Sequence, residues 1–256
     1  MSVRQPALGS LLARLLSRAP LSRAEQEAIL ALPHRLERIP AGRYLVRAGD
    51  TPSRCYALLE GFAYRHKVVG NGARQIVGIH VVGDLVDLHN SMLDQADENV
   101  QALTEISVAV IVAARITELI DRFPGVAKAL LKESLIDGAI FSEWIANVGR
   151  RDSRSRMAHI LCELAIRQKA VGLADGAHFN LPMTQDQLAD ALGLTPVHVN
   201  RTLKQLESEG LISRSKRAVS IEDWEALTRV GDFSATYLHL PGPAQEVRSG
   251  IRAHLV

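Results

Sequence analysis

Amide, cationic and small apolar side chains share one face of a helix predicted near residues 196–209. At 100° per residue, Val197, Arg201 and Lys204 lie together, with Asn200 beside them. An arginine fork can bond both major-groove acceptors of guanine, an asparagine amide suits adenine, and a methyl group can contact thymine. The opposite stripe is apolar and is expected to be buried: Val199, Leu203 and Leu206. This pattern predicts a helix whose exposed face reads base edges.

The elements that would position this helix have clear boundary signals. Thr184-Gln-Asp-Gln187 is a capping box, so a first helix is expected to begin there and to end at Gly193. Thr195 can then cap a second helix with Pro196 at its first position, where proline is favoured. Two short helices joined by a tight glycine turn predict a helix-turn-helix.

The segment after the second helix is predicted to be a hairpin with a basic tip. Residues 211–221 alternate between apolar and polar types, and they contain Arg214, Lys216 and Arg217. Between residues 150 and 217 there are 11 Lys and Arg against 7 Asp and Glu, whereas the rest of the chain has 19 against 21. A basic module on a mildly acidic body favours a polyanion as partner. The alternative is an ordinary helical hairpin with solvated charges.

The N-terminal half combines short helices with a β-rich region. Residues 8–32 are predicted to be helical, with a capping box at Ser22-Arg-Ala-Glu25. From residue 38 to about 114, short apolar runs alternate with turn signals, which is typical of a β-barrel or sandwich. Asn71-Gly72 predicts a hairpin with a type I′ turn.

Residues 116–148 are predicted to form a helix with two adjoining apolar stripes. Such a helix can cover its own domain and also pair with a second copy of the chain. The residues predicted to form the dimer contact are Ile136, Ile140, Trp144 and Ile145. A helix buried entirely within one chain is the alternative. Residues 149–152 are expected to break the helix as a hinge before another helix at 153–168.

This order of elements resembles the cyclic-AMP receptor protein/Fnr superfamily over about residues 20–225. The most specific likeness is the run from Thr184 to Leu206. The resemblance implies an α+β fold with a cyclic-nucleotide-binding-like β-roll, a long dimerisation helix and a C-terminal winged helix-turn-helix. The implied division is 1–115 for the sensing domain with its N-terminal helices, 116–150 for the dimerisation helix and hinge, 151–230 for the DNA-binding domain, and 231–256 for a tail of unknown role.

The resemblance also implies a function and its residues. A homodimer would regulate transcription by binding an inverted-repeat operator in double-stranded DNA, with RNA polymerase as a further partner. Arg201 matches the family's base-reading arginine, whereas Val197 departs from the usual glutamate, so the family's common half-site is not assumed. The implied DNA-binding residues are Thr184, Thr195, Pro196, Val197, His198, Asn200, Arg201, Lys204, Arg214, Lys216 and Arg217. His198 is equally compatible with a capping or packing role.

The residues that hold a cyclic nucleotide in this family are not found in the β-rich region of the sequence. The Gly-Glu pair that holds the ribose in cyclic-nucleotide binders is replaced after Gly83-Asp84, and the segment 98–103 lacks the phosphate-binding arginine. A buried phosphate without a guanidinium would be costly, so cyclic AMP is not expected. The family's N-terminal cysteine cluster is absent as well, which excludes that iron–sulfur sensor. Asp87, His89 and Asn90 are candidates to line an effector cavity.

Two other classes of function fit the sequence less well. A cupin-like metal enzyme needs a His-x-His pair with a nearby carboxylate, whereas His66, His80 and His89 are isolated. A ligand-binding adaptor without DNA binding does not account for exposed cations on the second helix. No catalytic or metal site is predicted, and Cys55 and Cys162 are expected to be inert buried thiols. The sequence shows neither a signal peptide nor a membrane span, so a cytoplasmic location is expected.

Overall fold

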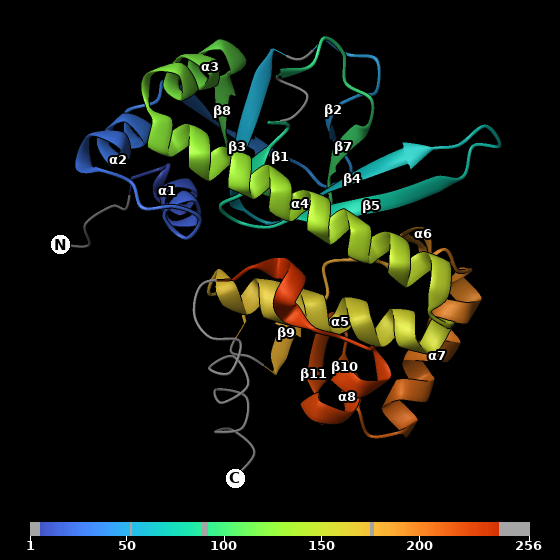
Figure 1. Cartoon of the computed structure of the whole chain (residues 1–256). Helices are drawn as coiled ribbons and strands as arrows, with labels where there is room; N and C mark the ends of the chain where they lie inside the picture. Colours follow the sequence, from blue (N-terminus) through green and yellow to red (C-terminus); the bar gives the residue numbers. More distant parts are fainter. Residues whose placement is uncertain (1–5, 52, 89–91, 175–176, 241–256) are drawn as a thin grey trace. The chain divides into compact units, whose positions relative to one another are not determined.

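The computed structural model describes residues 6–51, 53–88, 92–174 and 177–240 (Figure 1). The chain divides into two units, each described here by itself. The first contains Met1–Lys67 and Val77–Gly138, and the second contains Val68–Ile76 and Ala139–Val256.

The first unit consists of two antiparallel sheets and the helices that cover one of them. Its helices are α1 (Gly9–Leu16), α2 (Arg23–Leu30), α3 (Ala113–Arg122) and the first part of α4 (Pro124–Arg150). One sheet has the order β1 (His34–Ile39), β8 (Ile106–Val112), β3 (Arg54–Glu60) and β6 (Leu85–Val86). The other has the order β2 (Tyr44–Val46), β7 (Asn99–Ala102), β4 (Ala63–Val68) and β5 (Arg74–His80). The predicted β-rich fold of this part of the chain is confirmed.

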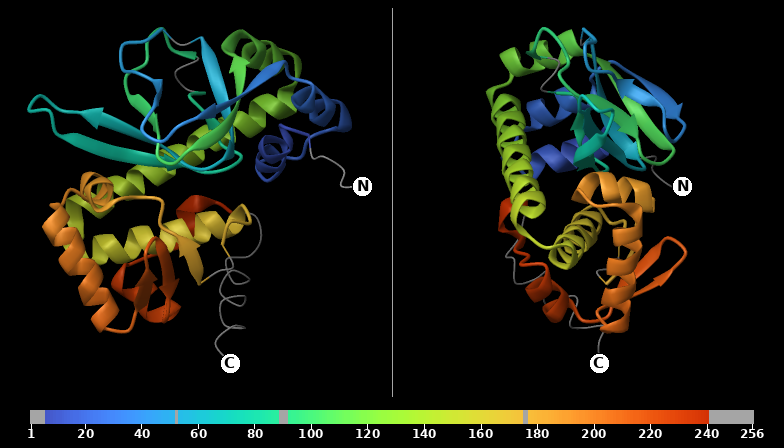
Figure 2. Two further views of the ribbon diagram at one scale, coloured as in Figure 1. Left: turned by 180° about the vertical axis from the view of Figure 1, so that it is seen from behind. Right: turned by 90° about the vertical axis from the view of Figure 1, so that its right-hand side faces the viewer.

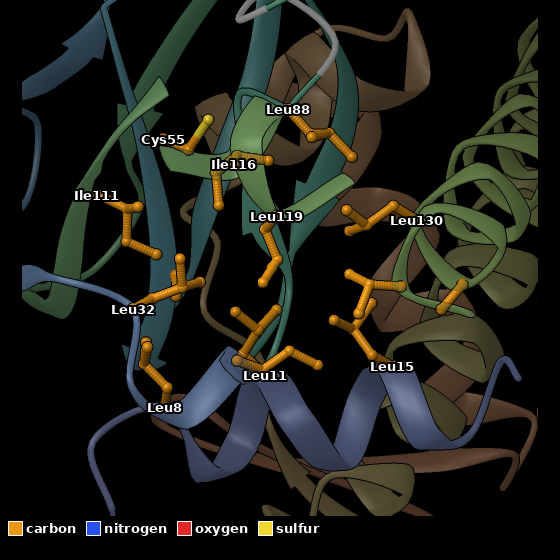
Figure 3. Packing of buried hydrophobic residues seen from close by; sticks show 14 of the residues in the cluster. Leu8, Leu11, Leu15, Leu32, Cys55, Leu88, Ile111, Ile116, Leu119 and Leu130 are labelled. Atoms are coloured by element: carbon orange, nitrogen blue, oxygen red, sulfur yellow. The ribbon is translucent and has the colours of Figure 1, made fainter. Parts of the chain in front are cut away.

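Strand alternation separates the interior of this unit into two apolar clusters. In β3, Cys55 and Ala57 belong to the cluster formed with the helices, whereas Leu58 belongs to the cluster formed with residues of both sheets. Successive side chains of a strand point to opposite faces, so one strand contributes to both clusters. Figure 3 shows the helix-side cluster, in which Leu11 and Leu15 of α1 lie near Leu119 and Leu130.

The hairpin at residues 69–73 has a different turn from the predicted type I′. The N–H of Gly72 donates to the carbonyl of Val69 (2.8 Å), and the N–H of Val69 donates to the carbonyl of Ala73 (2.9 Å). Gly72 has φ +82°, but Asn71 lacks the positive φ that a type I′ turn needs at both central residues. Because Gly70 lengthens the loop to three residues, only Gly72 must adopt the left-handed conformation.

The helical segment predicted from residue 116 is two helices rather than one. α3 ends at Arg122, and Phe123 has extended backbone angles (φ −128°, ψ 93°) before α4 begins at Pro124. The proline ring disfavours helical angles for the preceding residue, which explains the break. α4 then continues for 27 residues to the predicted hinge.

The second unit contains the predicted winged helix-turn-helix, which is confirmed. After the last turns of α4 come α5 (Ser153–Ala170), β9 (His178–Asn180), α6 (Gln185–Leu192), α7 (Pro196–Ser208), β10 (Ile212–Ser215), β11 (Ala218–Ile221), α8 (Trp224–Val230) and the 3-10 helix η2 (Ala235–Leu238). The strands form one sheet in the order β10-β11-β9, and the β10–β11 hairpin lies beside α7 (Figure 2). β9, α8 and η2 were not predicted.

In the part of the chain that the structure describes, no helix is both long enough and apolar enough to cross a membrane.

Candidate nucleic-acid interface

The start of α7 is fixed by its cap. The side chain of Thr195 accepts a hydrogen bond from the N–H of His198 (3.3 Å), and Pro196 occupies the first helical position. The Nδ1 atom of His198 lies 3.2 Å from the same hydroxyl oxygen. His198 therefore takes part in the cap, while its ring stays exposed.

The two faces of α7 are as the sequence predicts. Val199, Leu203 and Leu206 are buried, and Thr202 is buried with them. Val197 is 79% exposed, and Arg201 and Lys204 are exposed as well. These three residues line a shallow surface hollow together with Gln185, Pro196 and Asn200. Within the described residues, Arg201 and Lys204 form no ion pair, so their charges remain available.

α6 begins with a capping box and is joined to α7 by a side-chain hydrogen bond near its start. Thr184 and Gln187 form the predicted capping box, with the Gln187 N–H donating to Thr184 (3.2 Å) and the Thr184 N–H donating to Gln187 (2.8 Å). The amide of Asn200 donates to Gln185 Oε1 (3.4 Å), which joins the two helices at the exposed face. Gly193 ends α6 in the left-handed conformation, at φ +61°.

Wing residue Arg214 is already paired within the chain. Its Nε and Nη2 atoms donate to the two carboxylate oxygens of Glu207 in α7, at 3.0 and 2.7 Å. This bond holds the pKa of Glu207 below its ordinary value. Lys216 and Arg217 at the hairpin tip are exposed, and Lys216 has φ +56°. Of the three predicted wing residues, Lys216 and Arg217 therefore remain the candidates for phosphate contact.

Two arginines at the start of α5 support the helix-turn-helix, and sequence reasoning missed both roles. Arg154 donates from Nε to both carboxylate oxygens of Glu209 at the end of α7 (3.1 and 3.0 Å), which lowers the pKa of Glu209. Arg156 donates to the carbonyl of Leu192 at the end of α6 (2.9 Å). Arg156 and Leu192 are 36 positions apart in the sequence, and Arg154 and Glu209 are 55 positions apart. Contacts over such separations leave no local signal in the sequence.

The exposed stripe of α4 differs from the predicted dimer contact. Ile136, Ile140 and Trp144 are only 3%, 6% and 6% exposed, because the chain itself covers them. They leave almost no surface for a partner, so they are the wrong residues for the centre of an interface. Ile145 is 74% exposed, and it shares one helix face with Leu131 and Leu135, which are 61% and 66% exposed.

Asp87 is the predicted effector-lining residue that lies within the described part of the chain. Asp87 is buried and has φ +71°, and its carbonyl oxygen lies 3.9 Å from Cys55 Sγ. His89 and Asn90 lie outside the described residues. His66 is buried and packs near the rings of Tyr44 and Tyr64, with centroid distances of 5.9 and 5.2 Å.

The first unit also buries a guanidinium that sequence reasoning missed. Arg65 of β4 is 5% exposed, and it lies 3.6 Å from Glu98 and 3.8 Å from Asp137 of α4. Two carboxylates therefore surround this cation. The alternating β-strand pattern gives no indication that a charged residue points inward.

A second buried ionic cluster joins α1 to α4 and to the turn before β6. Arg14 lies 2.8 Å from Glu133 and 3.0 Å from Asp84, and Arg18 also donates to Glu133. His80 Nδ1 lies 3.5 Å from Asp84. The carboxylates raise the pKa of Arg14 despite the opposing effect of burial. His80 is thus engaged in the core of this unit.

Among the residues described, no group of three or more His, Cys, Asp and Glu side chains is arranged to hold a metal ion. Cys55 and Cys162 are both buried, and burial raises the pKa of Cys162.

Comparison with known proteins agrees with this architecture. Residues 36–123 match the cyclic nucleotide-binding domain family, and residues 155–230 match the Crp-like helix-turn-helix domain family. Over 199 residues the chain is 29% identical to the transcriptional activator protein FnrL of Cereibacter sphaeroides, covering 76% of this chain and 79% of that protein. It is 28% identical over 191 residues to the nitrogen fixation regulation protein FixK of Rhizobium meliloti, covering 73% and 82%.

A solved structure has the same fold. FixK2 from Bradyrhizobium japonicum superimposes with a TM-score of 0.72 at 21% identity, covering 80% of this chain and all of that one. A β-roll, a long helix and a winged helix-turn-helix define a class of DNA-binding transcription regulators. This chain belongs to the Crp/Fnr family of transcription regulators.

Proposed function

We propose that the chain binds an inverted-repeat operator as a homodimer and reads bases with the exposed face of α7. The observation that carries this proposal is the exposed face around Val197, where Arg201 and Lys204 form no ion pair with another described residue. An α-helix fits the major groove, and a two-fold dimer places its two recognition helices on half-sites about one helical turn apart.

Each side chain of the face has a separate task. Arg201 bonds the O6 and N7 atoms of one guanine, and such a bidentate contact discriminates by about 1–3 kcal/mol. Asn200 is held by Gln185, which orients its amide toward an adjacent base. Val197 offers methyl groups to thymine, so an A·T pair is expected where it docks.

Phosphate contacts surround these base contacts. Thr184, Thr195 and His198 lie at the first turns of α6 and α7, where helix N-termini favour an anion. Lys204 on α7 and the wing residues Lys216 and Arg217 supply the positive charge. These contacts fix the position of the protein on the duplex without reading its sequence.

The dimer contact is proposed to be the stripe of Leu131, Leu135 and Ile145 on α4. Gly138 and Ser142 occupy the intervening positions, which gives the 4-3-4-3 spacing of a coiled-coil seam. Three large apolar side chains that are more than half exposed on one helix face are typical of a buried interface with a second copy.

The effector is proposed to be something other than cyclic AMP. Arg65 is already neutralised by Glu98 and Asp137, so a buried phosphate would have to displace carboxylates. Because FnrL is named a transcriptional activator, contact with RNA polymerase is proposed as the route from DNA binding to regulation.

The test is selection of binding sites from random DNA, followed by affinity measurements at several salt concentrations. Arg201→Ala is expected to weaken the selected operator by about 1–3 kcal/mol and to relax preference at one base pair in each half-site. Lys216→Ala is expected to weaken all sequences alike and to reduce the salt slope by about one phosphate.

Arg229→Ala is the matched control, because this exposed arginine of α8 carries the same charge in the same unit but lies outside the proposed interface. It is expected to leave the base preference unchanged. If the Arg201 variant selects the same bases as wild type, the proposed reading face is wrong.

A further inference from the structure

The segment after α8 packs on the helices before the helix-turn-helix. Residues 231–239 lie beyond residue 230, where the match to the Crp-like helix-turn-helix domain ends. Tyr237 stacks on His159 of α5, with a centroid distance of 5.9 Å and an interplanar angle of 14°. Phe233 meets the same His159 ring edge-on at 5.2 Å, and Leu238 is 2% exposed. The segment is therefore an integral part of the second unit.

Three elements converge on one buried carboxylate. Glu163 of α5 is fully buried. It accepts hydrogen bonds from Trp144 Nε1 in α4 (3.0 Å) and from the hydroxyl of Tyr237 in η2 (2.7 Å). Burial raises the pKa of Tyr237, so its hydroxyl keeps the proton that it donates. Arg167 lies 3.3 Å from the same carboxylate and supplies the opposite charge. The end of α4, α5 and the C-terminal segment are thus joined at a single group.

The same segment also contacts the hinge between α4 and α5. Arg151 Nη2 donates to Glu143 of α4 (2.7 Å), to the Asp232 carboxylate (3.1 Å) and to the Asp232 carbonyl (3.2 Å). Gly231 approaches α5 so closely that a Cβ there would lie 2.7 Å from the backbone nitrogen of His159. The chain leaving α8 therefore passes directly over the helix that follows the hinge.

We propose that residues 231–239 are a positioning element that fixes the angle between α4 and α5, and thereby the separation of the two recognition helices in a dimer. The inference rests on the proposed function, because α4 would carry the dimer contact and α7 would carry the base contacts. A fixed angle allows both recognition helices to engage at one half-site spacing. A loose hinge allows several spacings, each with an added ordering cost.

The spacing preference tests this role, because a merely structural role would not change it. Affinity is measured for the selected operator and for a version with one inserted base pair, which changes the half-site separation by about 3.4 Å and the rotation by about 35°. Wild type is expected to bind the altered operator about tenfold more weakly. The ratio of the affinity for the native operator to that for the altered operator is expected to fall toward unity in Tyr237→Ala. The variant should lose affinity for the native operator and lose much less for the altered one.

A second variant and a control keep the test decisive. Tyr237→Phe retains the ring on His159 and removes the hydroxyl with its contacts to Glu163 and His159 Nε2, so it is expected to change the ratio in the same direction by less. Thr236→Val is the matched control, since the exposed Thr236 hydroxyl lies 2.8 Å from that of Ser234 in the same segment. Hydrogen exchange is expected to rise at residues 148–153 in the Tyr237 variants and to remain unchanged at residues 196–208.

The outcomes separate the two proposals. If wild type binds no operator, the proposed function fails. If wild type prefers one spacing and both Tyr237 variants keep the same ratio, the positioning role is refuted. Equal weakening on both operators also refutes it, because that result describes loss of folded protein.

Discussion

Removing the Glu133 carboxylate is expected to destabilise the first unit strongly. Glu133 of α4 faces Arg14 at 2.8 Å and also accepts from Arg18, and the side chains of these arginines are 11% and 1% exposed. In Glu133→Ala two positive charges would stay in this region without the carboxylate between them. Breaking a buried pair by removing one partner costs about 3–5 kcal/mol, which is a large part of the ~5–15 kcal/mol stability of a typical domain.

The assay is urea denaturation monitored with two probes. Both tryptophans, Trp144 and Trp224, lie in the second unit, so their emission reports that unit, whereas hydrogen exchange in α1 and α4 reports the ionic cluster. Glu133→Ala should lower the midpoint for the first unit and reduce protection of residues 9–18. Glu27→Ala is the control, because Glu27 pairs with Arg23 on the surface of α2, where such pairs contribute little. If both variants lose the same small stability, the cluster does not hold α1 to α4.

Two further predictions concern the dimer and the response to pH. Leu135→Asp places a charge in the proposed α4 seam and should give monomers with weakened operator binding in analytical ultracentrifugation, whereas an unchanged dimer would locate the interface elsewhere. Burial lowers the pKa of His159, whose neighbours are Arg151, Glu143, Glu163 and the Gly231 carbonyl. The pKa of His159 is lower in the folded chain than in the unfolded chain, so the unfolded chain binds the proton more readily as the pH falls. The contribution of neutral His159 to the free energy of unfolding is therefore complete above about pH 6.5 and is lost below it. The tryptophan-detected urea midpoint should therefore drop between pH 7.5 and 5.5, and His159→Gln should reduce that drop; an equal drop in both proteins would show that other groups cause it.

The helix-turn-helix could be predicted from sequence because its determinants are local. Thr184, Gly193, Thr195 and Pro196 each define a helix end through contacts within four residues. The buried stripe of α7 likewise follows from helix periodicity alone. The break before Pro124 carried the same kind of local signal, and it was missed because the apolar pattern continues across it.

The dimer face could not be chosen from sequence in the same way. α4 has two adjoining apolar stripes, and periodicity does not tell which one the chain itself covers. The structure buries Ile136 and Ile140 and exposes Leu131, Leu135 and Ile145. The choice therefore depends on tertiary packing and not on helix periodicity. The pairing of Arg18 with Glu133, 115 residues apart, was unpredictable for the same reason.

The positive charge that DNA would meet is smaller than the composition of residues 150–217 suggests. Arg154 is held by Glu209, and Arg214 is held by Glu207, so each of these cations neutralises a carboxylate of α7. The lowered pKa values keep both carboxylates ionised, and the paired arginines offset the negative charges that would otherwise repel phosphate. The exposed cations around Arg201 and at the wing tip are therefore expected to supply the affinity for DNA. Glu207→Gln should release Arg214 and make DNA binding both tighter and more dependent on salt without changing the bases selected, and quantitative binding on selected and scrambled DNA would reveal this.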